Sequence, residues 1–263
     1  MRKILKELLP PVLLRKITGY FYGWRGNYPD WESAGKKCSG YDSKAILEKV
    51  SESALKVKMG LAAFERDSVV FNEIEYNYPV VSALLWIASG NNGKLRVLDF
   101  GGSLGSMYYQ HRFLFTSLSE VRWCIVEQPA FVEEGKRNFA DERLKFYYSI
   151  EECLKENSVD VILLSSVLPY IGKPYDLLES IKTNNFRYIL FNKMHLTDKP
   201  DRITIQRVNP AIYRASYPCW FLNKQKFLDF MMEEYELIFG FDNPDSVNLR
   251  SEIKGFIFRL REN

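Results

Sequence analysis

The chain has 263 residues, of which 46% are hydrophobic and 15% aromatic, enough for one large domain or a domain with an appendage, and this excludes a disordered protein. Its formal net charge of +3 is too small to indicate nucleic-acid binding. Four scattered Cys residues show no C-x-x-C or Cys/His ligand spacing, so we expect no metal site and a reducing compartment, the cytoplasm.

The first 26 residues combine an apolar stretch with basic residues. Pro10 and Pro11 interrupt the stretch, Arg15 and Lys16 follow it, and it is too short to span a bilayer. It matches a signal peptide poorly, because no small-residue cleavage site follows. Two interpretations stay open: an interfacial segment at the inner membrane or on a partner, or a helix packed on its own domain.

Residues 1–93 are predicted to form a helical region that caps the acceptor side of the molecule. Apolar residues at helical spacing predict a helix over 43–64, with Ser43 as its cap, and a second helix that starts at residue 78 and is ended by Gly90 and the Asn-Asn-Gly turn at 91–93. The Glu-Arg-Asp stretch at 65–67 is interpreted as a solvated or salt-bridged turn between them.

Residues 94–263 are predicted to form the second domain. Short apolar runs alternate with helical stretches there, which is typical of a parallel sheet covered by helices on both faces. Right-handed crossovers then give a doubly wound sheet. The predicted strands are 95–100, 122–127, 144–149, 160–167 and 187–192, and the predicted helices are 105–118, 130–139, 150–157 and 174–183.

The C-terminal stretch breaks this alternation. A helix at 224–234 is followed by two strands, 235–241 and 253–260, with no helix between them. Strands joined in this way pair antiparallel or flank another strand, so we expect a reversed strand beside the last parallel one. The predicted fold class is therefore α/β: a Rossmann-like doubly wound sheet with a terminal antiparallel strand, plus the N-terminal helical region.

A glycine-rich stretch follows the first of the predicted parallel strands. Gly101, Gly102 and Gly105 lack a Cβ and let a ligand approach the backbone, at the place where open parallel sheets bind ligands. Asp99 ends the strand, where its carboxylate would disfavour a pyrophosphate on the helix N-terminus. The charge favours a cationic, phosphate-free ligand such as S-adenosylmethionine (SAM), on which Asp99 would act directly or through water.

A second carboxylate, Glu127, ends the next predicted strand. It follows Asp99 near the spacing at which nucleotide-binding sheets place an acid on the ribose hydroxyls. The alternatives are a helix-capping role for Asp99 and an exposed strand-end acid for Glu127. Further groups are expected to line the cofactor: Gln128 beside the adenine, Ser149 and the Ile150 backbone at its edge, and Ser165 with Ser166 in the same cleft.

These residues resemble the class I SAM-dependent methyltransferases. From about residue 20 onward, the chain is also similar to a family of bacterial methyltransferases whose genes accompany surface-polysaccharide (capsule or O-antigen) clusters. Two stretches are specific to that family, W-E-x-A at 31–34 and E-R-D-S at 65–68, whereas the glycine loop is shared by many methyltransferases.

The resemblance implies a cytoplasmic enzyme that uses SAM and releases S-adenosyl-L-homocysteine (SAH). Its acceptor would be a glycan, a nucleotide-sugar or a phosphate-linked sugar, methylated on a hydroxyl or a phosphate-linked oxygen. One position departs from the family pattern. Where such proteins often carry an acid and an Arg before a Pro, this chain has Asn192, Lys193 and His195, so its acceptor can differ.

Methylation of a hydroxyl is helped by a general base. His195, just past the fifth predicted strand, is the preferred candidate, and a His on a surface loop is the alternative interpretation. His111 is expected behind or beside the cofactor, and Lys193 could bind a phosphate or carboxylate. Five aromatic residues could form a sugar-stacking wall or serve as packing: Tyr108, Tyr109, Tyr213, Tyr217 and Trp220.

Three other functions stay open. The first is an N-methyltransferase acting on an amino sugar. The second is an NAD-dependent sugar oxidoreductase or epimerase, which the placement of the glycines and the missing Tyr-x-x-x-Lys pair disfavour. The third is a non-catalytic SAM-fold scaffold of a glycan assembly complex, docked through residues 1–26.

Overall fold

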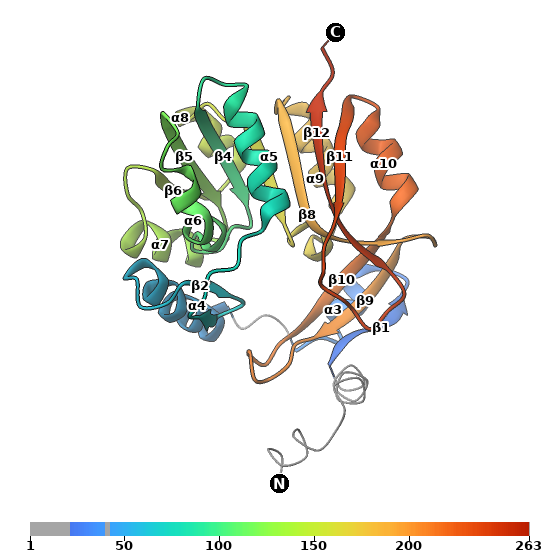
Figure 1. The fold of residues 1–263 in the computed structure, drawn as a ribbon. Helices are drawn as coiled ribbons and strands as arrows, with labels where there is room; N and C mark the ends of the chain where they lie inside the picture. The colour runs from blue at the N-terminus through green and yellow to red at the C-terminus, as the bar shows by residue number, and fades with distance from the viewer. Residues whose placement is uncertain (1–21, 40–42, 263) are drawn as a thin grey trace.

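The structure is a computed structural model that describes residues 22–39 and 43–262 (Figure 1). Most of the segment 1–26, with both of its interpretations, lies outside the described residues, as do the residues just before Ser43. Within the described ranges, no helix has the length and apolar character that a membrane crossing requires.

The centre of the molecule is a parallel sheet with the strand order β6-β5-β4-β7-β8. The chain leaves β4 toward β5 and β6 and then returns to β7 and β8 on the other side, so the order reverses beside β4. All four strand pairs are parallel, as predicted. The bounds are β4 (Lys94–Phe100), β5 (Glu120–Val126), β6 (Leu144–Tyr147), β7 (Val161–Ser165) and β8 (Tyr188–Thr197).

The C-terminal strands complete this sheet in the predicted way. The last strand, β12 (Glu252–Leu260), pairs antiparallel with β8, and β11 (Tyr235–Asp242) pairs antiparallel with β12. A reversed strand therefore lies next to the last parallel one. The mostly parallel sheet with an antiparallel edge confirms the predicted fold class, the Rossmann-like fold of class I methyltransferases.

Helices cover both faces of the central sheet and divide its core into two clusters. Side chains such as Val97, Leu163 and Leu190 pack on one face, whereas the adjacent Leu98 and Leu164 pack on the other, because successive strand residues alternate. The first face is covered by α5 (Tyr78–Ser89), α6 (Ser106–His111) and α7 (Pro129–Asn138), and the second by α8 (Ile150–Glu156), α9 (Pro174–Thr183) and α10 (Lys224–Met232).

A smaller antiparallel sheet, which we did not predict from the sequence, extends the molecule beyond β8. Its order is β1-β9-β10, and it is built from β1 (Gly23–Tyr28), β9 (Arg202–Arg207) and β10 (Ser216–Asn223). The two sheets join because β8 continues past its predicted end to Thr197 and pairs with the end of β10.

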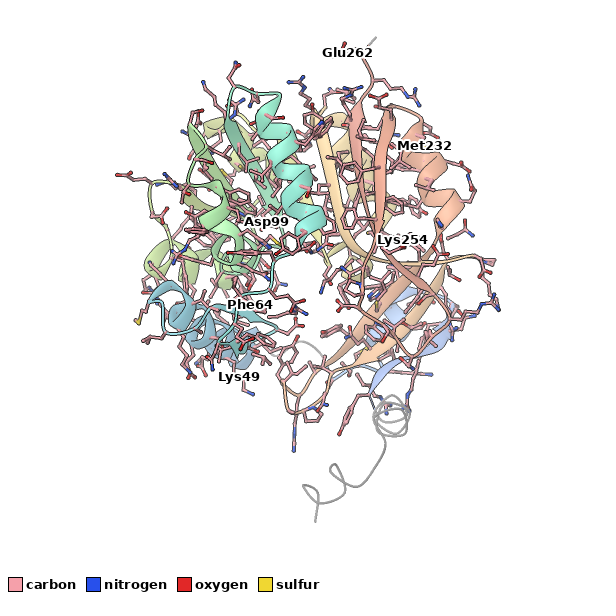
Figure 2. The ribbon with its side chains drawn as sticks, viewed as in Figure 1. Lys49, Phe64, Asp99, Met232, Lys254 and Glu262 are labelled. Atoms are coloured by element: carbon pink, nitrogen blue, oxygen red, sulfur yellow. The ribbon has the colours of Figure 1, made fainter. Side chains whose placement is uncertain are left out.

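The N-terminal region contains strands as well as helices, which corrects the expectation of a helical region. Besides α3 (Trp31–Gly35) and α4 (Ser43–Lys58), it holds β1 and a hairpin of β2 (Phe64–Arg66) and β3 (Val69–Phe71). In Figure 1, the α4–β2 unit and the smaller sheet lie at the same end of the central sheet. Figure 2 labels Phe64 of this hairpin and Asp99 of β4, which both lie on that side of the molecule.

Candidate active site

The loop 101–105 joins β4 to α6 at the carboxyl edge of the central sheet, beside the point where the strand order reverses. Gly101 and Gly105 have φ angles of +72° and +95°, a region that favours glycine. A Cβ on Gly101 would lie 2.5 Å from the Val167 side chain, and one on Gly102 would lie 2.5 Å from the Asp99 carboxyl carbon. The loop is therefore packed tightly against Val167 and Asp99, and its glycines carry no side chain that would cover the backbone.

Asp99 lies under this loop with only 1% of its surface exposed. The Trp123 indole N–H donates to its carboxylate at 3.0 Å. Burial raises the pKa of Asp99 to about 7; the Trp123 hydrogen bond opposes the increase and the nearby Glu127 adds to it. In this position Asp99 supports Gly102, and its charge rather than direct contact would act on a ligand above the loop.

Glu127 connects the end of β5 to the same loop. One carboxylate oxygen accepts from the Ser103 N–H at 3.3 Å and the other from the Gln128 N–H at 2.7 Å. Burial raises the pKa of Glu127, and these two backbone N–H groups oppose the increase. Each oxygen keeps further lone pairs for ligand hydroxyls. Gln128 is exposed beside it, with its side chain making no cap for α7.

Ser149 and Ile150 lie at the start of α8, after β6. The Ser149 hydroxyl accepts from the Glu152 N–H at 3.1 Å and so caps the helix. Ile150 is 4% exposed and packs in the core, so its backbone is the part that can face a ligand. Both positions fit the predicted adenine edge, and their role toward a cofactor stays a prediction.

Ser165 and Asn192 continue the edge on the other side of β4. They are register partners at the ends of β7 and β8, and the Asn192 side-chain N–H donates to the Ser165 hydroxyl oxygen at 2.9 Å. The next residues, Ser166 and Lys193, both have positive φ, as does Ser103 after β4. Non-glycine residues in this conformation are strained, and such strain is concentrated at functional sites.

Glu65 of β2 is a third carboxylate at the loop, and our interpretation of 65–67 as a solvated or salt-bridged turn is wrong for it. It is 5% exposed and accepts from the Ser106 hydroxyl, at the start of α6, and from the Ser68 N–H at 3.2 Å. Burial raises the pKa of Glu65, these two hydrogen bonds oppose the increase, and Asp67 adds to it. Glu65 is part of the E-R-D-S stretch at 65–68, which the sequence resemblance had singled out without giving this residue a role.

Glu65, Asp99 and Glu127 together form what we call the acidic rim. In the part of the chain that the structure describes, no ion pair joins any of the three to a Lys, Arg or His side chain. Buried charges are normally paired, so the rim lacks a counter-charge. A pyrophosphate would meet repulsion here, whereas a cation would be attracted.

His195 is buried in the smaller sheet's junction with β8, not on a surface loop. Its ring stacks on Phe221 at 5.1 Å between centroids and meets Trp24 edge-on at 5.2 Å, and its Nδ1 lies 3.3 Å from the Cys219 sulfur. Burial lowers the pKa of His195 to about 4, so the ring is neutral at pH 7. It remains a predicted base, of low basicity.

His111 has no capacity left for proton transfer. Its Nε2 accepts from the Asn77 N–H at 2.9 Å, and its Nδ1 lies 2.8 Å from the Met107 carbonyl oxygen, to which it therefore donates. Burial lowers the pKa of His111 to about 4. His111 therefore holds the start of α5 in place against α6.

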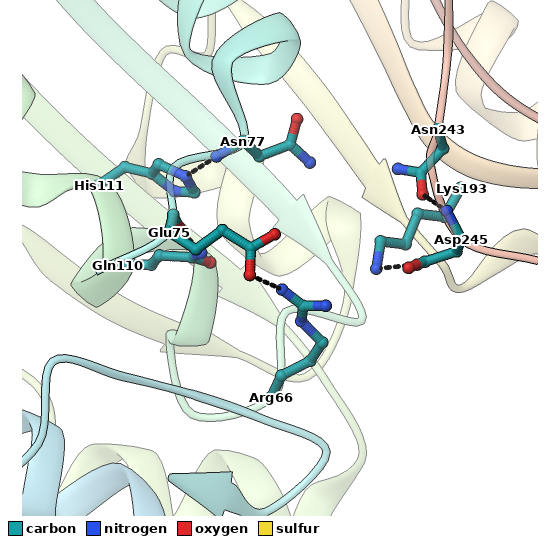
Figure 3. A network of polar contacts seen from close by, with 8 residues as sticks. All are labelled: Arg66, Glu75, Asn77, Gln110, His111, Lys193, Asn243 and Asp245. Carbon is teal, nitrogen blue, oxygen red and sulfur yellow. Dashed lines mark hydrogen bonds and ion pairs between the residues drawn. The ribbon is translucent and has the colours of Figure 1, made fainter. Parts of the chain in front are cut away.

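Charged groups face one another across the mouth of the site (Figure 3). Lys193 pairs with Asp245 at 2.5 Å on one side, and Arg66 pairs with Glu75 at 3.2 Å on the other. Asp67 lies among these groups with part of its surface exposed: desolvation by the surrounding elements raises the pKa of its carboxyl, Lys193 and Arg66 oppose the increase, and Asp245 adds to it. Lys193 is therefore already paired with a carboxylate, which disfavours its predicted role in binding a phosphate.

Only part of the predicted aromatic wall faces this side. Tyr108 is buried against Trp123, and Tyr109 is buried against Tyr108 and Phe139, so both serve as packing. Tyr217 meets Tyr170 edge-on at 5.3 Å, and its hydroxyl lies 3.4 Å from that of Tyr213. Lys193, Asp245, His195, Tyr170 and Tyr217 together form what we call the acceptor wall.

Two other findings bear on the site. Within the residues that the structure describes, no group of three or more His, Cys, Asp or Glu side chains could hold a metal ion. A surface hollow of about 730 Å³ lies along α9, and no residue of the glycine loop lines it. Its lining is Glu151, Tyr175, Asp176, Glu179, Ser180, Thr183, Asn184 and Phe230.

No protein-family model and no curated protein sequence matches the chain. Three similar solved structures are a SAM-dependent methyltransferase from Clostridium acetobutylicum ATCC 824 (12% identity, 71% of this chain and 93% of that one, TM-score 0.45), the N-terminal domain of EvdMO1 in the presence of SAH and D-fucose (13%, 84% and 98%, 0.49), and magnesium protoporphyrin IX methyltransferase from Synechocystis PCC 6803 with bound SAM (10%, 85% and 99%, 0.47). At these identities and scores the likeness is a general one, and the fold class is defined by the strand order above.

Proposed function

We propose that this protein is a SAM-dependent methyltransferase. The observation that carries the proposal is the acidic rim: three carboxylates, two buried and one half-buried, lie around the glycine loop at the switch point of the sheet, without a counter-charge among the described residues. SAM has a sulfonium, an ammonium and no phosphate, so it supplies the missing positive charge. Two unit charges 4 Å apart attract by about 1–4 kcal/mol at effective dielectrics of 80 to 20.

Each part of the cofactor has a group of suitable chemistry on this edge. Glu127 keeps lone pairs for the two ribose hydroxyls, and Gln128, the Ser149 hydroxyl and the Ile150 backbone surround the expected adenine position. Gly101 and Gly102 carry no side chain, and their close packing on Val167 and Asp99 brings the loop backbone down onto the strand ends. When bound, SAM supplies an activated methyl group. The protein's task is to align the acceptor with it and exclude water.

We propose a sugar or a sugar-linked substituent as the acceptor, in the biosynthesis of bacterial surface polysaccharide, which places the enzyme in the cytoplasm. The acceptor wall supports this, because tyrosine rings and carboxylates suit a polyhydroxylated ring. His195, whose ring is neutral at pH 7, would take the proton of the acceptor hydroxyl. The same carboxylates would also suit the ammonium of an amino sugar, so N-methylation is the second candidate.

The cofactor assignment can be tested by calorimetry with SAM, SAH and NAD. We expect the wild type to bind SAM and SAH but not NAD, and Glu127→Gln to weaken SAM binding by about tenfold or more, since a hydrogen bond to a charged group is lost. Glu120→Gln is the matched control, because Glu120 lies on the same strand at the opposite edge of the sheet. Binding of NAD in place of SAM would overturn the proposal.

A further inference from the structure

Asn192 is a fully buried polar side chain that is only half satisfied. It is 0% exposed at the carboxyl end of the parallel part of β8. Its side-chain N–H donates to the Ser165 hydroxyl, but its carbonyl oxygen Oδ1 has no hydrogen-bond partner among the described residues. A buried acceptor without a donor destabilises the folded protein, so an apolar residue of similar size would be expected here if packing alone mattered.

The bond from Asn192 decides what Ser165 can do. A hydroxyl has one hydrogen and two acceptor lone pairs, and the Asn192 N–H occupies one of the lone pairs. The Ser165 hydrogen is thereby directed away from Asn192, and no hydrogen bond within the described chain uses it. Ser165 is partly exposed while Asn192 is not, so the free donor is on the open side of the pair.

Ser165 and the acidic rim lie on one face of the sheet. In the register of the ladders, Asp99 pairs with Ile125 and with Leu163, so Glu127 and Ser165 each stand two residues further along, level with Gly101. Side chains two residues apart on a strand share a face. The edge therefore presents an acceptor at β5, a glycine at β4 and a donor at β7, and the end of β8 holds this donor in place.

We propose that Ser165, positioned by Asn192, donates its hydroxyl hydrogen to the carboxylate at the methionine end of SAM. The inference rests on the proposed function and assigns one part of the cofactor to one side of the site. The acidic rim attracts the positive groups of the ligand but repels its carboxylate. Beyond β4, Ser165 offers that carboxylate a hydroxyl hydrogen that no hydrogen bond within the described chain uses.

Decarboxylated SAM provides the test, because it keeps the sulfonium and the amine and lacks only the carboxylate. By calorimetry, Ser165→Ala should weaken SAM binding by about 10- to 100-fold, the usual effect of losing a hydrogen bond to a charged group, and leave the binding of decarboxylated SAM unchanged. Ser158→Ala, next to the other end of β7, is the matched control and should change neither affinity.

The role of Asn192 is tested in the same assay by a double-mutant cycle. Asn192→Leu should weaken SAM binding in the wild type, by less than Ser165→Ala does, and should have no further effect in the Ser165→Ala background, because it acts only through that hydroxyl. Asn192→Ser serves the same purpose if the leucine variant does not fold. Melting curves without ligand verify that each variant is folded.

The outcomes separate the two proposals. A wild type that binds neither SAM nor decarboxylated SAM overturns the proposed function and this inference with it. A wild type that binds SAM, with a Ser165→Ala variant that loses equal affinity for both ligands, overturns only the carboxylate assignment. Additive effects of the two substitutions overturn the positioning role of Asn192.

Discussion

The acidic rim and the acceptor wall lie side by side at one edge of the sheet, yet they treat charge in opposite ways. Glu65 and Asp99 are buried and Glu127 is half-buried, and none of the three is paired with a cation within the described residues, whereas on the wall Lys193 is paired with Asp245. The rim is electrically incomplete until a ligand supplies positive charge. The charges of the acceptor wall are balanced within the protein. It can therefore recognise an acceptor by shape and polarity, and it does not need a charged group from the acceptor.

The largest effect that tests this contrast is expected for Asp99→Asn without ligand. The pKa of Asp99 is raised from its usual 3.8 to about 7, so the folded protein keeps a proton that the unfolded chain releases above pH 4. The free energy of unfolding of the wild type should therefore fall as the pH rises, by about 1.4 kcal/mol per pH unit and about 4 kcal/mol by pH 7.

The asparagine variant has no proton to lose and can still accept the Trp123 hydrogen bond. In urea denaturation at pH 8 it should be more stable than the wild type by up to about 4 kcal/mol, with little difference at pH 4. It should also bind SAM more weakly, a gain in stability at the expense of function. Equal stability of the two proteins at pH 8 would show that the Asp99 carboxylate is not strained by burial.

The second prediction concerns the loop above Asp99. Gly102→Ala would place a Cβ 2.5 Å from the Asp99 carboxyl carbon, and that side chain is confined by Trp123 and cannot move aside. We expect a loss of about 1–3 kcal/mol in the free energy of unfolding, as for overpacked cores. Gly35→Ala is the control, since a Cβ there meets nothing within 4 Å. Similar behaviour of the two variants would contradict the packing described here.

These two regions also differ in how far the sequence predicted them. The parallel strands and their order of connection follow from local patterns, because each apolar run is followed by its own helix. Once these strands are predicted, the residues at their ends are known as well: Asp99, Glu127 and Ser165. The smaller sheet depends on pairing between β1 and β9, which are more than 170 residues apart, and no local pattern encodes such a pair.

Glu65 and His195 show the same limit within the site itself. Glu65 lies in a three-residue strand, too short for a periodic signal, and only its contact with Ser106 of α6 brings it to the rim. The burial of His195 was equally hidden, because its neighbours Trp24 and Phe221 come from β1 and β10. When the neighbours of a side chain come from distant segments, its burial and hydrogen bonding can be predicted only once the fold is known.

The third prediction links the rim to ligand binding through protons. A bound cation favours the ionised form of Asp99, so SAM binding near pH 6 should release close to one proton, and affinity should rise by up to tenfold per pH unit until about pH 7. Calorimetry in two buffers of different ionisation enthalpy measures the release. SAH, which lacks the sulfonium charge, should release less. Binding of SAM without any proton release would place the cation away from Asp99.

The smallest effect is expected on the side of the acceptor wall. The segment 243–251, which carries Asp245, is fastened to β1 by Asn248, whose side chain accepts from the Trp24 N–H at 2.8 Å and donates to the Trp24 carbonyl at 2.9 Å. Asn248→Ala removes both bonds at an exposed position, so we expect a loss of about 1 kcal/mol in the free energy of unfolding.

Affinity for SAM should stay unchanged in this variant, because neither bond touches the acidic rim. Asn243→Ala, in the same segment but without a bond to β1, is the control for a general effect of the segment. If Asn248→Ala weakened SAM binding as strongly as Glu127→Gln, the two sides would act as one unit. The contrast between an acidic rim that needs a cationic ligand and an acceptor wall whose charges are already paired would then be wrong. The hydrogen bonds between Asn248 and β1 would in that case contribute to the cofactor site.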